Sequence, residues 1–180
     1  MVYPLPAILV SCGRGDEANL MTAAWTGTVC TNPPMLYISV RPERHSHAII
    51  SREMEFTVNL TTADMARATD FCGVRSGRDT DKWAATGLTQ VPGVACCPAV
   101  GESPLSIECR VKTVMRLGSH DMFLADVVNV MADERWIDTE GRFDLQASGL
   151  MSYSHGAYIG PGEYLGHFGF SVKKNKNIHK

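Results

Sequence analysis

The stretch Leu105–Leu117, LSIECRVKTVMRL, decides the fold class. Its side chains alternate between apolar and polar, and this period of two predicts a strand with one buried and one polar face. We expect the buried face to hold Leu105, Ile107, Cys109, Val111, Met115 and Leu117. We expect the polar face to hold Ser106, Glu108, Arg110, Lys112 and Arg116. The turn residues of 118–121 and a second strand, Met122–Ala132, complete a predicted antiparallel hairpin.

Outward from this hairpin, further strands are predicted from short stretches rich in β-branched or aromatic residues near Gly or Pro. They are Ala7–Cys12, Thr22–Cys30, Met35–Val40, Phe56–Leu60 and, with the weakest pattern, Val94–Val100. Many short antiparallel strands around one core predict a mainly β fold, a small barrel.

Only a few short helices are expected, each from a capping residue and a following terminator. Ser46 would cap His47–Arg52. Thr62 would cap Ala63–Cys72, with Gly73 as its left-handed terminator, and Asp79 would cap Thr80–Thr86, with Gly87 just past the end.

Length and charge exclude several classes of protein. The 180 residues predict a single domain spanning 1–180, and a net charge of −2 argues against a nucleic-acid partner. No apolar run approaches the ~20 residues of a membrane helix, so no membrane partner is expected. The N-terminus lacks the pattern of a signal peptide, which predicts a cytoplasmic location. The basic tail at 173–180 is expected to be a solvated end.

The six cysteines and six histidines show no metal-binding spacing, so we predict no metal. The simplest interpretation is reduced cysteines that pack as small apolar side chains. A redox-active thiol is the alternative, and the sequence does not single out a candidate for it.

The segment Asn19–Trp25 (NLMTAAW) joins small residues to one large aromatic. Small side chains let a planar ligand approach the backbone, while Trp25 offers a broad wall and one N–H donor. The alternative is a strand with small core residues.

The segment Ser39–His47 (SVRPERHSH) combines Ser39, Arg41 and Arg44 with the predicted start of a helix. The guanidinium groups of arginines and the free N–H groups of a helix N-terminus bind phosphate well, so this loop is a candidate anion site. The alternative is a solvated polar loop.

The segment Cys72–Trp83 (CGVRSGRDTDKW) places Ser76 and Arg78 before a short helix that carries Lys82 and Trp83. Lys82 is a candidate partner for an anion. The alternative is a surface helix whose ion pairs contribute little stability.

Taken in order, these segments resemble the flavin reductase–like family. The motifs are Asn-x-Met-Thr-Ala-Ala-Trp (19–25), Pro-Pro (33–34), Ser-Val-Arg-Pro-x-Arg-His-Ser (39–46), Glu-Phe-Thr-Val-Asn-Leu (55–60), Cys-Gly-x-x-Ser-Gly-Arg-Asp-x-Asp-Lys-Trp (72–83) and Leu-Ser-Ile-Glu-Cys-Arg-Val (105–111). Within the family the sequence is most similar to flavoredoxins and ferric-reductase-type relatives. The likeness runs from about Pro6 to Asp133. Two positions depart from it: Trp83 stands where the family usually has Phe, and Glu43 where some relatives have a basic residue.

The resemblance implies a six-stranded Greek-key split β-barrel, noncovalently bound FMN near a barrel mouth, and a homodimer. It implies that the isoalloxazine ring is lined by Asn19, Met21, Thr22, Ala23, Ala24 and Trp25. It implies that the ribityl phosphate is surrounded by Ser39, Val40, Arg41, Arg44, His45 and Ser46. Asn59 and Leu60 would flank the flavin, and Lys82, with Trp83 beside it, would approach the ring or the phosphate.

Three functions follow from the resemblance. The first is an FMN-dependent oxidoreductase that takes electrons from NAD(P)H or a redox protein. The second is a noncatalytic electron carrier of the flavoredoxin type, and the third is a flavin-binding barrel without turnover. No Gly-x-Gly-x-x-Gly follows a strand, so a nicotinamide would have to stack directly on the flavin. The sequence assigns no catalytic residue.

Overall fold

The predicted hairpin forms the centre of the sheet in a computed structural model, which describes residues 2–172. Strands β9 (Leu105–Arg116) and β10 (Asp121–Ala132) pair antiparallel and belong to a seven-stranded sheet of order β3-β2-β6-β9-β10-β5-β4. Its other members are β2 (Ile8–Cys12), β3 (Asn19–Ala23), β4 (Thr26–Thr31), β5 (Pro34–Val40) and β6 (Glu55–Leu60). The mainly β prediction is therefore confirmed, with seven strands in this sheet instead of six.

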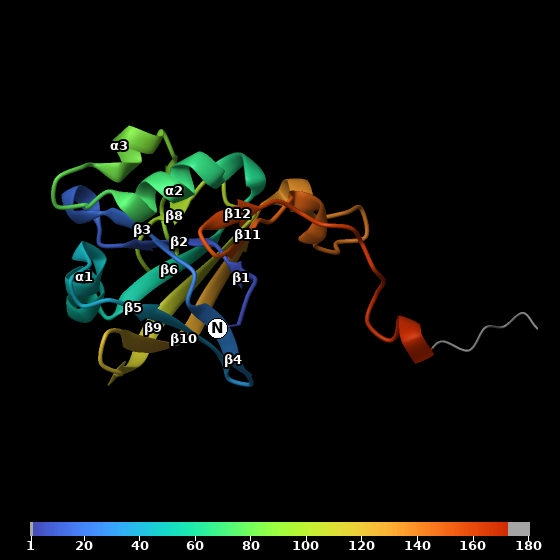
Figure 1. Ribbon diagram of the computed structural model, residues 1–180, viewed down its shortest axis with the longest axis horizontal. Helices are drawn as coiled ribbons and strands as arrows, with labels where there is room; N and C mark the ends of the chain where they lie inside the picture. The colour runs from blue at the N-terminus through green and yellow to red at the C-terminus, as the bar shows by residue number, and fades with distance from the viewer. Residues whose placement is uncertain (1, 173–180) are drawn as a thin grey trace, which may run out of the picture.

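The additional strand arises where the predicted strand Thr22–Cys30 breaks at Ala24 and Trp25. The resulting strands β3 and β4 are the two outer strands of the sheet, although only these two residues separate them in the chain. The sheet must therefore roll until its two edges meet, which makes it a split barrel (Figure 1). At this corner the Ser39 amide donates to the Trp25 carbonyl at 2.8 Å.

The barrel encloses the main core, and a second core lies beneath two helices. Ile8 and Val10 of β2 point into the barrel, while Leu9 points the other way into a cluster with Leu20, Met65 and Trp83. Helices α2 (Ala66–Val74) and α3 (Lys82–Thr86) cover that second cluster, and α1 (His45–Glu53) lies beside the barrel (Figure 1). Strand β2 is thus buried on both faces.

Two features predicted for the central strand are wrong. Ser106 and Glu108 are buried, at 3% and 0% exposure, whereas Met115 and Leu117 are exposed. The carboxylate of Glu108 accepts hydrogen bonds from the Ala95 amide, and the segment around residue 95 covers this face of β9. Met115 and Leu117 instead lie near the tip of the hairpin, beyond the barrel wall.

The predicted strand Val94–Val100 shrinks to β8 (Ala99–Val100), which pairs with β7 (Gln90–Val91). The amides of Ala95 and Cys96 donate to Glu108 and are not available to a strand neighbour. This buried carboxylate therefore takes the place of a sheet partner.

The helices are short, as predicted, but their ends differ. Helix α1 begins at His45, so Ser46 lies within its first turn. Gly73 lies inside α2 and does not terminate it; a Cβ there would make a tight contact of 3.3 Å with Thr22 Cβ. Asp81, and not Asp79, caps α3 by accepting from the Ala84 amide, while Gly87 ends it at φ +69° as expected.

The remaining elements lie outside the barrel wall. A small sheet joins β1 (Leu5–Pro6), β11 (Ser152–Ser154) and β12 (Ala157–Ile159). Short 3₁₀ turns occur at Gly15–Glu17, Ala63–Met65, Glu134–Trp136, Gln146–Ser148 and Phe170–Val172. The expectation for the tail at 173–180 lies outside the described residues. In the described part of the chain, no helix is long and apolar enough to cross a membrane.

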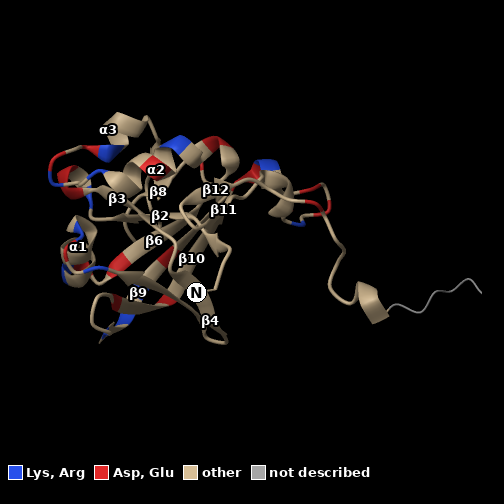
Figure 2. Cartoon of the chain, in the orientation of Figure 1, with Lys and Arg blue, Asp and Glu red and all other residues tan. Residues whose placement is uncertain are grey.

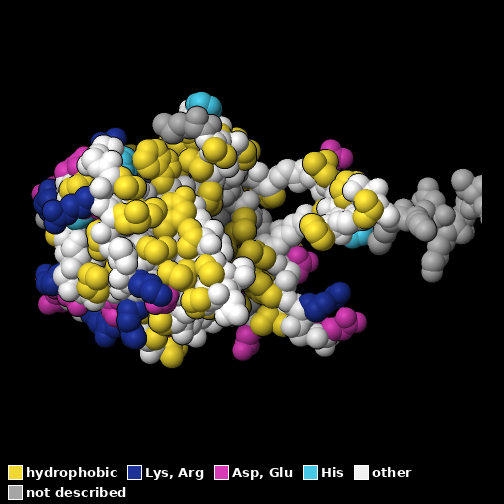
Figure 3. All heavy atoms as spheres, turned by 90° about the horizontal axis from the view of Figure 1, so that it is seen from below, with side chains coloured by type: hydrophobic (Ala, Val, Ile, Leu, Met, Phe, Trp, Pro, Cys, Tyr) yellow, Lys and Arg dark blue, Asp and Glu magenta, His cyan; other side chains and the backbone are white. Residues whose placement is uncertain are grey.

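Apolar side chains remain exposed along the lower strands of Figure 1. We give the name apolar strand face to the part of the surface that holds Val29 of β4, Val114 and Met115 of β9, and Val128 and Val130 of β10, each at least 36% exposed. Val114 and Met115 are successive residues, so their side chains lie on opposite sides of β9. Figure 3, seen from below, shows hydrophobic side chains gathered over this side of the molecule. Exposed apolar surface of this extent is typical of an interaction site.

Candidate functional site

A cavity of about 410 Å³ lies where β3, the start of α1 and the loop between α2 and α3 meet. Five cationic side chains line this cationic cavity, against one carboxylate, that of Glu43. The cations are Arg41, Arg44, Arg75, Arg78 and Lys82. Figure 2 shows Lys and Arg in the loops beside α1 and α3. The excess of positive charge favours an anionic ligand.

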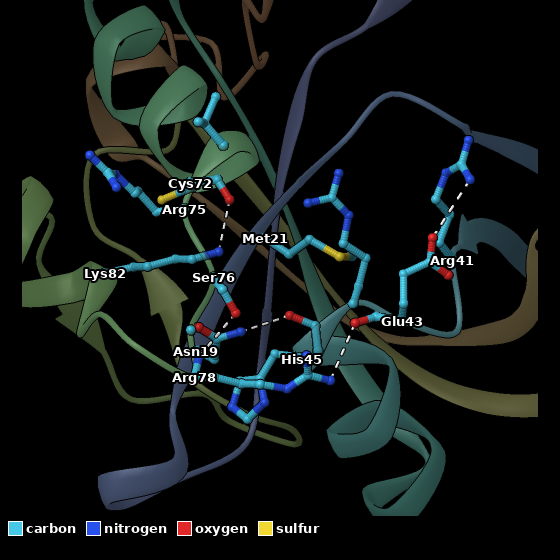
Figure 4. Close-up of a pocket in the computed structure, with 14 residues that line it drawn as sticks. Asn19, Met21, Arg41, Glu43, His45, Cys72, Arg75, Ser76, Arg78 and Lys82 are labelled. Carbon is cyan, nitrogen blue, oxygen red and sulfur yellow. Dashed lines mark hydrogen bonds and ion pairs between the residues drawn. The ribbon is translucent and has the colours of Figure 1, made fainter.

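The floor of the cationic cavity is a buried polar contact between β3 and α1. The Asn19 side-chain amide donates to the Ser46 hydroxyl at 2.8 Å (Figure 4). Gly77 of the α2–α3 loop lies against this pair, since a Cβ there would be only 2.2 Å from Asn19 Oδ1. The site therefore requires a glycine at this position, and the first-turn N–H groups of α1 lie next to it.

Lys82 is held at the side of the cavity by two main-chain carbonyls. Its Nζ donates to Leu20 O at 2.7 Å and to Cys72 O at 2.8 Å, and the residue is only 5% exposed. Burial lowers the pKa of Lys82. An ammonium group has three N–H donors, so one remains for a ligand.

The arginines of the cavity are held more loosely. Arg78 donates to the Glu43 carbonyl at 3.3 Å, and Arg41 pairs with the Glu43 carboxylate at 3.6 Å (Figure 4). Arg44 reaches across to the Gly73 carbonyl of α2 at 3.1 Å. None of these contacts uses all the N–H donors of a guanidinium, so each arginine keeps donors for an anion.

A second cavity of about 160 Å³ adjoins the first at the corner between β3 and β4. This small-residue cavity is lined by Met21, Thr22, Ala23, Ala24, Trp25, Ser39, Val40, Arg41, Arg44 and His120. It shares Met21, Arg41 and Arg44 with the cationic cavity. The Trp25 and His120 rings are 4.4 Å apart and form its outer wall.

The structure thus brings together most of the predicted site residues. Asn19, His45, Ser46 and Lys82 line the cationic cavity, and the segments 21–25 and 39–41 line the small-residue cavity, with Arg44 in both.

Three predicted residues lie elsewhere. Asn59 is fully buried, and its amide bonds to Leu9 O and the Val100 amide inside the protein. Leu60 packs against the barrel core. Trp83 lies in the second core, where its Nε1 has no hydrogen-bond partner within residues 2–172.

Several lining residues, among them His120 and Arg75, were not predicted from the sequence as ligand contacts. His120 belongs to the β9–β10 turn, and it reaches the site because β10 pairs with β5, with Asp121 opposite Val40. Arg75 follows α2 directly and was treated only as part of a polar loop. Neither shows a local pattern, so only the tertiary pairing could have identified them.

The described residues contain no group of three or more His, Cys, Asp or Glu side chains arranged to hold a metal ion. Cys12 and Cys109 lie in the main core and Cys72 in the second core, and five of the six cysteines are buried: Cys12, Cys72, Cys96, Cys97 and Cys109. Burial raises the pKa of Cys12 and Cys96 to about 12, and that of Cys72 and Cys97 to about 11.

We therefore expect one thiol per native chain to react rapidly with Ellman's reagent near neutral pH. That thiol is Cys30, the least buried, because thiolate formation and access both control reactivity. Six thiols should react once the chain is denatured. Two or more rapidly reacting thiols in the native protein would instead indicate an activated cysteine.

A family model described as the flavin reductase like domain matches residues 1–158. The chain belongs to the flavin reductase–like family. Among solved structures of similar fold is the flavoredoxin of Desulfovibrio vulgaris (Miyazaki F), with 30% identity, a TM-score of 0.88, and coverage of 96% of this chain and 95% of that one.

Two other relatives carry names that mention FMN. The FMN-binding protein of Thermus thermophilus, solved with bound 1-cyclohex-2-enone, has 25% identity, a TM-score of 0.80, and coverage of 92% of this chain and 90% of that one. The FMN reductase (NADH) RutF of Enterobacter cloacae is 24% identical over 124 residues, 69% of this chain and 73% of its own. The predicted family is therefore confirmed.

Proposed function

We propose that this flavin reductase–like protein holds FMN noncovalently, with the phosphate in the cationic cavity and the isoalloxazine ring along the small-residue cavity. The observation that carries the proposal is that the two cavities adjoin and share Met21, Arg41 and Arg44 among their lining residues. One end thus offers charge for a phosphate, and the other offers backbone and small side chains for a planar ring.

The residues present fit such a ligand. The Gly77 position leaves room beside Asn19, and Ser46, Lys82 and the arginines keep N–H or O–H donors directed at an anion. In the small-residue cavity, the side chains of Ala23 and Ala24 are short enough for a ring to reach the main chain. Names of relatives that include FMN support the same ligand.

A bound flavin would supply the redox chemistry, and the protein would supply binding and electrostatics. Lys82 and the arginines place positive charge beside the ligand, which favours its anionic forms. We propose an FMN-dependent NAD(P)H oxidoreductase as the activity. The noncatalytic electron carrier remains the second candidate, supported by the likeness to a flavoredoxin over almost the whole chain.

The test is an FMN titration of purified protein, followed by a riboflavin titration. We expect FMN to bind more tightly than riboflavin, because riboflavin lacks the phosphate. Equal affinities would contradict a phosphate site. Anaerobic addition of NADH or NADPH then separates the two candidates: bleaching of the bound flavin supports the oxidoreductase, and its absence supports the carrier.

We also propose a homodimer, formed through the apolar strand face. Its support is the exposed valines and Met115 on β4, β9 and β10, which a second copy would bury (Figure 3). Sedimentation velocity should show a dimer that Val130→Glu converts to a monomer; a monomeric wild-type protein would contradict this. The cytoplasmic location stays a prediction.

A further inference from the structure

A cavity of about 520 Å³ adjoins the cationic cavity beside Lys82. The two cavities share five lining residues: Asn19, His45, Gly77, Arg78 and Lys82. The rest of the lining comes from residues 15–18 before β3, from the loop 79–81 and from residues 83 and 90. A group that extends from a phosphate in the cationic cavity in this direction would therefore enter the adjoining space.

The charge of this space is opposite to that of its neighbour, so we call it the acidic cavity. Its lining contains no Lys or Arg beyond the shared Arg78 and Lys82. It adds four carboxylates, those of Asp16, Glu17, Asp79 and Asp81. Figure 2 shows Asp and Glu in the loop that leads into α3. Positive charge thus gives way to negative charge within two adjoining cavities.

Two of the four carboxylates are not neutralised by a partner. Glu17 pairs with Arg52, and Asp81 accepts a hydrogen bond from the main chain of α3. Within residues 2–172, the side chains of Asp16 and Asp79 make no hydrogen bond or ion pair, and both residues are exposed. An anion that entered the acidic cavity would meet these two carboxylates without a matching cation.

Glu43 places one more carboxylate on the exposed side of the cationic cavity. Its side chain is 66% exposed and pairs with Arg41 at 3.6 Å (Figure 4). Lys82, by contrast, is only 5% exposed. An anion held deep in the cationic cavity therefore lies among cations, whereas an anion further out lies beside Glu43.

We propose that Asp16, Asp79 and Glu43 make the site selective for a flavin that ends in a single phosphate over a flavin dinucleotide. FMN ends at its phosphate, which the cations of the cavity would hold. FAD carries a second phosphate and an adenosine beyond the first, and this second phosphate would lie beside carboxylates in either direction. Like charges repel even at a partly hydrated surface. The inference rests on the proposed function, because it takes the flavin phosphate to lie in the cationic cavity.

The experiment titrates the wild-type protein with FMN and with FAD by isothermal titration calorimetry, at low salt and at about 0.5 M NaCl. At low salt we expect FMN to bind about 10-fold more tightly than FAD, or tighter still. The preference should shrink at high salt, because salt screens repulsion between exposed charges. A preference that does not depend on salt would indicate steric exclusion and would contradict the role of the carboxylates.

Three variants that each add two positive units to the net charge test the residues. Glu43→Lys and the double variant Asp16→Asn/Asp79→Asn should each raise FAD affinity about 5- to 10-fold and FMN affinity only about 2-fold. Glu134→Lys, exposed and outside both cavities, is the matched control and should leave the ratio of the two affinities unchanged. All four positions are exposed, and urea unfolding confirms that each variant folds.

Two results would overturn the proposal. One is equal affinity of the wild-type protein for FMN and FAD at low salt. The other is a ratio of affinities that Glu43→Lys and the double variant shift no further than Glu134→Lys does. The FMN titration is read first: if FMN does not bind, the proposed function fails and the selectivity fails with it. If FMN binds and FAD binds equally well, only the selectivity is wrong.

Discussion

Replacing Arg44 and Ser46 together by Ala should weaken FMN binding roughly 30- to 2,000-fold. The change removes a charged hydrogen bond, worth about 1.5–3 kcal/mol, and a neutral one, worth about 0.5–1.5 kcal/mol. Arg44 lines both cavities of the proposed flavin site, and Ser46 lies at the floor beside Asn19. The measurement is the dissociation constant from FMN fluorescence quenching.

Riboflavin and a second arginine supply the controls for this variant. Riboflavin affinity should change far less than FMN affinity, because riboflavin has no phosphate for these side chains to bind. Arg52→Ala, at the other end of α1 and paired with Glu17 and Glu53, should bind FMN like the wild type. An FMN affinity that is unchanged in the double variant would place the phosphate elsewhere.

Asn59→Leu should lower the free energy of unfolding by about 3–5 kcal/mol while leaving FMN affinity of the folded protein unchanged. The Asn59 amide donates to Leu9 O and Ser11 Oγ at 3.1 Å, and its oxygen accepts from the Val100 amide and the Ser106 hydroxyl. Leucine leaves several of these buried groups without a partner, at about 1–3 kcal/mol each. Urea unfolding measures the loss.

Asn129→Ala provides a graded comparison, because within residues 2–172 the Asn129 side chain makes a single hydrogen bond, to Glu108 at 2.8 Å. Its unfolding free energy should fall by about 1–2 kcal/mol. If Asn59→Leu instead folded with wild-type stability and lost FMN, then Asn59 would flank the flavin, as the family resemblance implies.

The strands could be predicted where the alternation of apolar and polar residues matches the alternation of buried and exposed side chains. The hairpin of β9 and β10 follows from its period of two, because its two faces meet different surroundings over most of its length. The pattern failed at Ser106 and Glu108: the Ser106 hydroxyl donates to Asn59 of β6, and main-chain amides of a covering segment near residue 95 donate to Glu108. Local sequence carries no information about such a covering segment.

The candidate site was predictable where its residues are consecutive. Residues 21–25 and 39–41 line one cavity because β3, β4 and β5 meet at one corner of the barrel. His120 was missed because it depends on the pairing of β10 with β5. Asn59 shares a motif with the site, but its side chain is buried inside the protein, where it bonds to Leu9 O and the Val100 amide.

The structure of the FMN complex tests the central claim most directly. The account predicts electron density for the phosphate within hydrogen-bond distance of Arg44 and Ser46, with the tricyclic ring lying against residues 21–25. Density for the phosphate in any other cavity, or a ring lying away from the β3–β4 corner, would contradict it.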